Sequence, residues 1–354
     1  MDSCVSKEHP QQEVSFVSLG MVLLDELHVP GKSPIFDVIG GSGGYGTLGA
    51  RLFAGATKSK TIGCLVLAGK DFPTATEAEL RGWGMTLLLR RDSTKLSTRG
   101  LLEYEDTTFG PKKFRYLTDP LKPSPADLQS TPLLGAKAFH LLATPEEITR
   151  QIPELMSLRR QYGVEQRPLI IWEPFPAACQ PSNRGSFLAA CSLVDVFSPN
   201  HIEVTGLFTD EKPKLFHCEQ LEFYAQTFLE ASVGPSGQGC VVIRAAEHGC
   251  LTASRSERFT WLPAYYALNA AEVIDPTGGG NAFLGGLAIG LQETASFAEA
   301  ASYGSVAASF ALEQIGLPSR NQLGDGETWN ETIVLSRLEE YKSRLDENII
   351  DRGR

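Results

Sequence analysis

The stretch IDPTGGGNAF, residues 274–283, is the part of the sequence that decides the fold. Pro276 cannot donate a hydrogen bond to a strand, so the chain must turn there. Gly278, Gly279 and Gly280 then allow dihedral angles that other residues avoid, and they let an anion approach the backbone. The apolar run that follows is typical of a helix, whose first N–H groups would face the same point. The stretch predicts a phosphate-binding loop, although a triple glycine alone more often makes a tight turn.

A second glycine run, IGGSGGYG, covers residues 39–46. Gly41 begins a G-x-G-x-x-G pattern, and Asp71 follows where a dinucleotide-binding fold places its ribose-binding acid. The preceding segment contains a proline and an aspartate, which makes it a poor central strand. We therefore reject the dinucleotide interpretation, because the structural context of the pattern is wrong.

Two further polar sites follow predicted strands. Asn200 and Glu203 lie three residues apart where a helix would begin, and they could position the waters of a magnesium ion. The same spacing also makes an ordinary helix cap, and on its own the cap is the better interpretation. Asp25 closes an apolar strand, where it could bind substrate hydroxyls or simply end the strand at the surface.

Composition limits the classes of function. The 354-residue chain has a formal net charge of −10, with 42 acidic and 32 basic side chains, which argues against a general nucleic-acid surface. No stretch reaches the roughly 20 apolar residues of a membrane span. The seven cysteines are scattered and the polar start of the chain has no signal-peptide core. We expect a cytoplasmic protein with no nucleic-acid or membrane partner.

The hydrophobic pattern predicts an α/β protein. From residue 136 onward, short apolar strands alternate with helices, which implies a mostly parallel sheet with right-handed crossovers. Residues 86–118 instead alternate apolar with polar side chains, as in a sheet with one wet face. Residues 1–13 are polar and expected to be disordered. Residues 321–354 predict an amphipathic C-terminal helix, with Leu335, Leu338, Tyr341 and Leu345 at helical spacing; such a helix covers the core more often than it docks a partner.

Along the chain, Asp25, the second glycine run, the Asn200–Glu203 pair and the glycine loop (residues 275–281) together resemble the ribokinase/pfkB family of ATP-dependent sugar and nucleoside kinases, over residues 14–320. Within that family the chain is most similar to a divergent fungal branch that includes the killer-virus maintenance protein. The resemblance implies a ribokinase-like three-layer sandwich with a small β-lid, built from parts of residues 24–45 and 86–118. It also allows a homodimer through the lid.

The resemblance also implies roles for individual residues. ATP would be held by the backbone of Gly278, Gly279 and Gly280, and Mg2+ would be held indirectly by Asn200 and Glu203. Further nucleotide contacts would come from Ala245, Gly249, Asp275 and Thr277, with Asp275 steadying the loop and the adenine between residues 245–249 and 301–308. The acceptor, a small sugar-like or nucleoside-like molecule, would contact Asp25, Gly41, Ser42 and Tyr45.

The chain departs from the family where the catalytic base should be. The family usually has an aspartate at the position of Asn281, whose amide has no basic site near neutral pH. General-base assistance is typically worth about 10²–10⁴ in rate. Other departures are Ser42 and Tyr45 in the second glycine run, Lys70 after the strand that follows it, and residues 244–246.

These departures leave two hypotheses. The first is an ATP-dependent phosphotransferase that acts on an alcohol group with slow or altered chemistry at Asn281. The second is a pseudokinase or scaffold that binds a nucleotide or a protein partner without efficient phosphoryl transfer.

Overall fold

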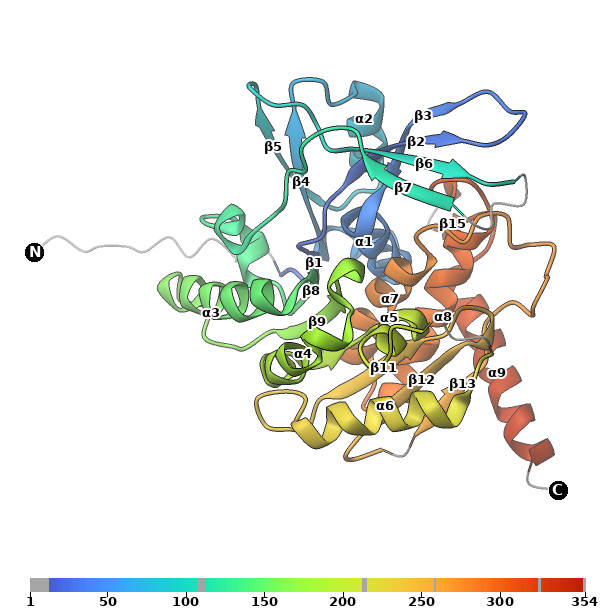
Figure 1. Ribbon diagram of the computed structural model, residues 1–354. Coiled ribbons are helices and arrows are strands. Elements are labelled where there is room, and N and C mark those ends of the chain that lie inside the picture. Colours follow the sequence, from blue (N-terminus) through green and yellow to red (C-terminus); the bar gives the residue numbers. More distant parts are fainter. Residues whose placement is uncertain (1–12, 107–111, 212–214, 258, 324–325, 353–354) are drawn as a thin grey trace, which may run out of the picture.

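A nine-stranded sheet forms the centre of the molecule, in the order β13-β12-β11-β10-β9-β8-β1-β4-β5 (Figure 1). The structure is a computed structural model and describes residues 13–106, 112–211, 215–257, 259–323 and 326–352. The strands are β1 (Phe16–Ser18), β4 (Ile62–Gly69), β5 (Thr86–Asp92), β8 (Ala138–Ala143), β9 (Leu169–Pro174), β10 (Val196–Phe197), β11 (Cys240–Arg244), β12 (Cys250–Ser254) and β13 (Thr260–Leu262). Neighbours from β5 to β11 pair in parallel, whereas β12 and β13 are antiparallel. The predicted mostly parallel sheet is confirmed.

Helices cover both faces of this sheet, because its central strands are apolar on both sides. One face packs against α1 (Gly41–Ala54), α2 (Thr74–Gly82), α7 (Gly279–Glu293), α8 (Phe297–Leu312) and α9 (Val334–Arg352). The other packs against α3 (Pro145–Gln161), α4 (Arg184–Ala190) and α6 (Cys218–Ala231), and α5 (His201–Gly206) follows β10. On this second face the rings of Trp172 and Phe187 stack with centroids 5.1 Å apart. The result is the predicted three-layer sandwich.

A separate four-stranded sheet, which we call the lid, lies beside the sandwich (Figure 1). Its strands are β2 (Leu23–His28), β3 (Ile35–Gly40), β6 (Arg99–Tyr104) and β7 (Lys112–Tyr116), in the order β3-β2-β6-β7. Only the later part of residues 86–118 belongs to the lid, because β5 joins the central sheet. Leu87 and Leu89 pack on one face of that sheet and Leu88 on the other, so the apolar half of β5 is covered on both faces. Residues 41–45 begin α1.

The C-terminal segment differs from the predicted helix at its start. The strands β14 (Arg320–Leu323) and β15 (Gly326–Trp329) pair antiparallel, and the helix begins at Val334. Val334, Leu338 and Tyr341 are buried against the core, whereas Leu335, predicted on the apolar face, is 56% exposed. The described part of α9 therefore covers the sandwich. The predicted disorder of residues 1–13 falls almost wholly outside the described residues.

Helices α1 and α7 approach each other so closely that their backbones touch. A Cβ atom at Gly49 would lie 1.9 Å from the carbonyl oxygen of Ala282, and one at Gly285 would lie 2.0 Å from that of Gly46. Glycine is required at both positions because a backbone neighbour cannot yield to a side chain. This contact sets the two glycine runs, which begin α1 and α7, side by side.

We expect Gly49→Ala to destabilise the protein by about 3 kcal/mol, because its methyl group would overlap the α7 backbone. Gly185→Ala is the matched control. Gly185 lies in α4, and a Cβ atom there would have no neighbouring atom within 4 Å, so this exchange should be neutral or stabilise by about 0.5–1 kcal/mol. Urea unfolding of the three proteins measures both effects. Equal unfolding free energies for Gly49→Ala and wild type would show that the helices can separate without cost.

Candidate active site

The glycine loop has the conformation that an anion site needs. Gly278 is the N-cap of α7 and has a φ of 79°, in the left-handed region. Asp275 is buried, and its Oδ1 accepts hydrogen bonds from the backbone N–H and the hydroxyl of Thr277, at 3.0 and 2.6 Å. Asp275 therefore holds the turn, and the free N–H groups of α7 face the space in front of it.

Tyr45 brings the second glycine run onto this loop. A Cβ atom at Gly278 would lie 2.3 Å from the ring of Tyr45, so the ring rests directly on the glycine backbone. Tyr45 is 2% exposed, and burial raises the pKa of its hydroxyl, as do the carboxyl groups of Asp275 and Asp25. The tyrosine is neutral and occupies space between the loop and the lid. Gly41 begins the same helix, after β3, a lid edge strand, which agrees with the rejection of the dinucleotide interpretation.

Two lid residues without any sequence motif close over the loop. The hydroxyl of Tyr104 donates to Asp275 Oδ2 at 3.0 Å, and Lys112 Nζ donates to the hydroxyl of Thr277. Lys112 Nζ also lies 3.5 Å from Asp275 Oδ1. Burial lowers the pKa of Lys112, while Asp275 and Asp25 oppose that change. Both residues lie in the alternating segment, where the pattern showed a strand but no function.

Asp25 is the buried acid of the lid. It is 4% exposed and lies so close to Gly40 and Gly100 that a Cβ atom at either would meet its carboxylate, at 1.8 and 2.4 Å. Burial raises its pKa to about 7, and Lys112 opposes the rise. Among the described residues, neither Asp25 Oδ1 nor the buried Ser42 Oγ has a hydrogen-bond partner. Unpaired buried oxygens are costly, and both oxygens can accept a hydrogen bond from a ligand hydroxyl or amide.

Asn281 makes its contact with a carboxylate from the neighbouring strand β9. Its Nδ2 donates to Glu173 Oε2 at 2.6 Å, and Glu173 Oε1 lies 2.9 Å from Arg244 Nη1. The ring of His140 lies 3.2 Å from Glu173 and is itself bonded to Ser18 at 2.9 Å. Burial alone would raise the pKa of Glu173, but Arg244, His140 and Asn281 hold it below its usual value. Sequence analysis missed Glu173, which lies inside an apolar strand.

Asn200 and Glu203 form the helix cap that the sequence left as an alternative to metal binding. Asn200 Oδ1 accepts from the backbone N–H groups of Ile202 and Glu203, and Glu203 Oε2 accepts from that of Asn200 at 2.7 Å. Burial raises the pKa of Glu203 to about 7, opposed by Arg244. Arg244 Nη2 lies 3.5 Å from the same carboxylate oxygen. A divalent ion here would stand beside a fixed cation, so these side chains do not fit the predicted magnesium site.

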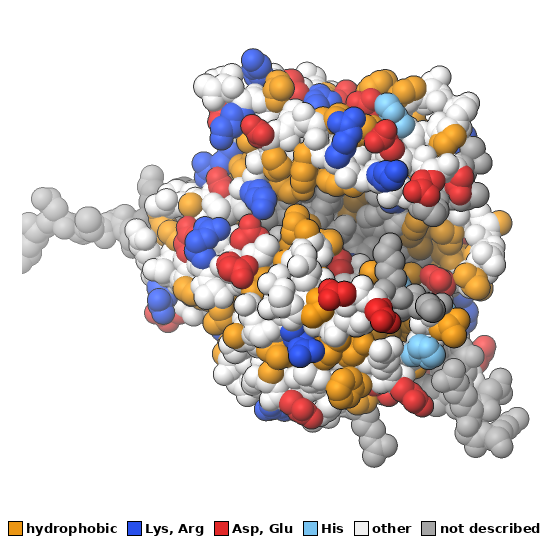
Figure 2. Space-filling model, in the orientation of Figure 1, with side chains coloured by type: hydrophobic (Ala, Val, Ile, Leu, Met, Phe, Trp, Pro, Cys, Tyr) orange, Lys and Arg blue, Asp and Glu red, His pale blue; other side chains and the backbone are white. Residues whose placement is uncertain are grey.

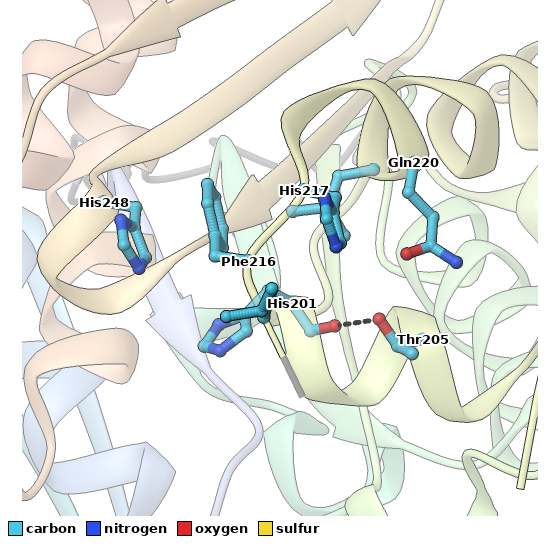
Figure 3. A pocket seen from close by; sticks show the side chains of 8 residues that line it. His201, Thr205, Phe216, His217, Gln220 and His248 are labelled. Carbon is cyan, nitrogen blue, oxygen red and sulfur yellow. Dashed lines mark hydrogen bonds between the residues drawn. The ribbon is translucent and has the colours of Figure 1, made fainter. Parts of the chain in front are cut away.

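Two cavities lie near these groups. The larger, about 200 Å³, lies between α5, α6 and the turn at residues 246–248 (Figure 3). The rings of Phe216 and His248 stack there with centroids 3.8 Å apart, and burial lowers the pKa of His201. The smaller, about 30 Å³, lies beside Ser42 and Phe175 and has room for about one water molecule. The lining of these two cavities does not decide where an adenine would bind, so its position between residues 245–249 and 301–308 stays a prediction.

Three further observations concern the surface, metal ligands and the helices. Basic and acidic side chains are interspersed over the face shown in Figure 2. Within the described ranges, no group of three or more His, Cys, Asp or Glu is arranged to hold a metal ion. None of the described helices has the length and apolar character needed to cross a membrane.

Comparison with known proteins identifies relatives over the whole chain. The model of the pfkB family carbohydrate kinases matches residues 133–322. An uncharacterized protein of Schizosaccharomyces pombe is 33% identical over 350 residues, 94% of this chain and 94% of that protein. Protein MAK32 of Saccharomyces cerevisiae is 30% identical over 355 residues, 95% and 94% of the two chains. These relatives confirm the predicted resemblance and its fungal branch.

Solved structures confirm the fold. The ribokinase of Giardia lamblia superimposes with a TM-score of 0.66 at 15% identity, covering 94% of this chain and 99% of its own. A putative ribokinase II from Escherichia coli, in complex with ATP and Mg2+, gives a TM-score of 0.64 at 15% identity with the same coverage. Similarity at this level of identity shows the ribokinase-like architecture.

We expect Asp25 to make stability fall as the pH rises. Its folded pKa of about 7 lies above the ordinary value of 3.8, so between those values the folded state binds more protons than the unfolded state. The unfolding free energy of wild type should therefore drop by about 2–3 kcal/mol more than that of Asp25→Asn between pH 5 and pH 8. Urea unfolding at the two pH values measures this, with the exposed Asp346→Asn as control. Parallel pH profiles for wild type and Asp25→Asn would contradict the assignment.

Proposed function

Because this chain belongs to the pfkB carbohydrate kinase family, we propose that it binds ATP and slowly transfers the terminal phosphoryl group to an alcohol of a small sugar-like or nucleoside-like molecule. The observation that carries the proposal is the pair of buried, unpartnered oxygens on Asp25 and Ser42, considered within the described residues. Both belong to the segments that meet the glycine loop, so an acceptor that satisfies them would lie next to the phosphates.

The reaction needs a hydroxyl oxygen to attack the terminal phosphorus while the bond from that phosphorus to the bridging oxygen breaks. The N–H groups at the start of α7 would stabilise the negative charge on the transferred group. The hydroxyl proton has to leave, and because Asn281 cannot accept it, the proton would pass late in the reaction to an oxygen of the transferred phosphoryl group and from there to solvent. Because phosphoryl transfer depends mainly on positioning and electrostatics, the reaction would be slowed rather than abolished.

The lid supports a ring-shaped acceptor. Phe114 is 47% exposed and lies against Gly100, on the side of β6 that faces Asp25. An aromatic ring beside a carboxylate suits a sugar or nucleoside, which presents an apolar face and hydroxyl groups together. Gly41 begins α1 directly behind this space, and its positive φ of 79° leaves the backbone close to Leu23.

A second candidate function is nucleotide binding without transfer. It is favoured by the Asn281 amide, which is committed to Glu173, and by the Tyr45 ring, which rests on Gly278. The glycine loop is formed in both arrangements. The first leaves no base at residue 281, and the second narrows the space for an acceptor. A robust turnover by the unmodified protein would exclude this candidate.

Two further parts of the proposal concern the cofactor and the compartment. The Escherichia coli neighbour is a complex with ATP and Mg2+, and we carry over the nucleotide but assign no side chain of this chain to the metal. We place the protein in the cytoplasm, supported by the free thiols of the described cysteines.

A homodimer through the lid stays a prediction. Ile35 and Phe36 of β3 are exposed on the edge of the lid.

The experiment measures ADP formation by wild type with a panel of sugars, nucleosides and vitamin-like alcohols. We expect a slow, acceptor-dependent rate. Asn281→Asp alone should gain little, because its carboxylate would lie next to that of Glu173 and one of the two would stay protonated. The double variant Asn281→Asp with Glu173→Gln should be faster than wild type by about 10²–10⁴.

Glu173→Gln alone is the control and should show no gain in transfer rate. Silence of every variant with every acceptor, together with intact ATP binding, would favour the second candidate. Absence of ATP binding would exclude both.

A further inference from the structure

Arg244 is the most unusual charged group of the site. It ends β11, and its side chain is about 10% exposed. Nη1 lies 2.9 Å from Glu173, and Nη2 lies 3.5 Å from Glu203 and donates to the carbonyl of Ser198 at 3.0 Å. The guanidinium therefore stands between two buried carboxylates, one from strand β9 and one from helix α5.

The same guanidinium points at the start of α7. A Cβ atom at Gly280 would lie 2.4 Å from Arg244 Nη1. Arg244 Nε has no hydrogen-bond partner among the described residues, although the side chain is buried. A buried, incompletely paired guanidinium beside free backbone N–H groups is a ready donor set for phosphate oxygens, which it can bind with two parallel hydrogen bonds.

A divalent ion in a kinase site does two things. It neutralises the acidic side chains around it, and it binds the phosphates of the nucleotide. Arg244 already pairs with both Glu173 and Glu203, and it lies where it can reach phosphates at the start of α7. A metal ion placed between these carboxylates would have to displace it.

We infer that Arg244 takes the place of a divalent cation in this site: it binds the nucleotide phosphates at the start of α7, so that nucleotide binding needs no metal ion. The inference rests on the proposed nucleotide site. Glu173 then competes with the nucleotide for Arg244 Nη1. Loss of the Arg244 guanidinium should therefore weaken nucleotide binding, whereas loss of the Glu173 carboxylate should strengthen it.

The first test uses the unmodified full-length protein. The dissociation constant for ATP is measured by isothermal titration calorimetry in excess EDTA and again in excess Mg2+. We expect the two constants to agree within about threefold. A constant more than about tenfold weaker in EDTA overturns the inference and leaves the proposed function standing, whereas no binding in either buffer overturns both.

Two variants separate phosphate binding from a structural role. Arg244→Gln should weaken metal-free ATP binding about tenfold or more, with partial recovery in Mg2+ because the acidic pair is then open to the ion. Glu173→Gln should tighten ATP binding several-fold, since it frees Nη1 and removes a negative charge. A purely structural ion pair predicts weaker binding for both variants, and that result would overturn the inference.

Arg167→Gln is the matched control. Arg167 pairs with Asp195 at 2.6 Å at the amino ends of β9 and β10, the opposite edge of the sheet from Arg244. Its loss should leave the affinity for ATP unchanged. Circular dichroism and thermal melting establish that each variant is folded. If Arg244→Gln does not fold, the EDTA comparison and Glu173→Gln decide the question.

Discussion

The contact between the backbones of α1 and α7 is the constraint on which the rest of the site depends. The two helices begin with glycine runs that are separated by more than two hundred residues of sequence; α7 follows the glycine loop, and α1 directly follows the lid strand β3. Gly49 and Gly285 remove the side chains that would keep the helices apart. Because the contact is backbone on backbone, it fixes the helix positions more rigidly than interdigitated side chains would. Tyr45 can then rest on Gly278, which brings the start of α1 against the glycine loop.

Around the start of α7, the charged groups that the family resemblance predicts are rearranged rather than lost. The expected carboxylate at residue 281 is an amide, but a carboxylate lies 2.6 Å away on Glu173, at the end of the neighbouring strand. That carboxylate is neutralised by Arg244, which in turn reaches Glu203. Asn281, Glu173 and Arg244 therefore form one electrostatic unit, in which each residue sets the charge that its neighbour can carry. An exchange of a single member changes the balance of all three.

The sequence was sufficient to predict what is local. Pro276 and the glycines after it specify their own turn, and the alternation of strands and helices specifies a parallel sheet. The sequence was insufficient where the structure depends on contacts between residues that are far apart in the chain. The alternation over residues 86–118 indicated strands but not which sheet β5 joins, and it gave no sign that Tyr104 and Lys112 reach the glycine loop. The spacing of Asn200 and Glu203 was compatible with a cap and with a metal site, and the structure shows the cap because Arg244, distant in sequence, faces the carboxylate.

The closed lid affects how an acceptor can enter. Tyr104 and Lys112 already make hydrogen bonds to the loop that carries Thr277. On the proposed function, an acceptor that reaches the unpaired oxygen of Asp25 from the lid side would have to break these contacts. Part of its binding free energy would then be spent on opening the lid, and the measured affinity would fall by the cost of that change. An acceptor with hydroxyl groups for both Asp25 and Lys112 would recover this cost, whereas a simple alcohol would not, so a lid of this kind would favour polyhydroxylated molecules.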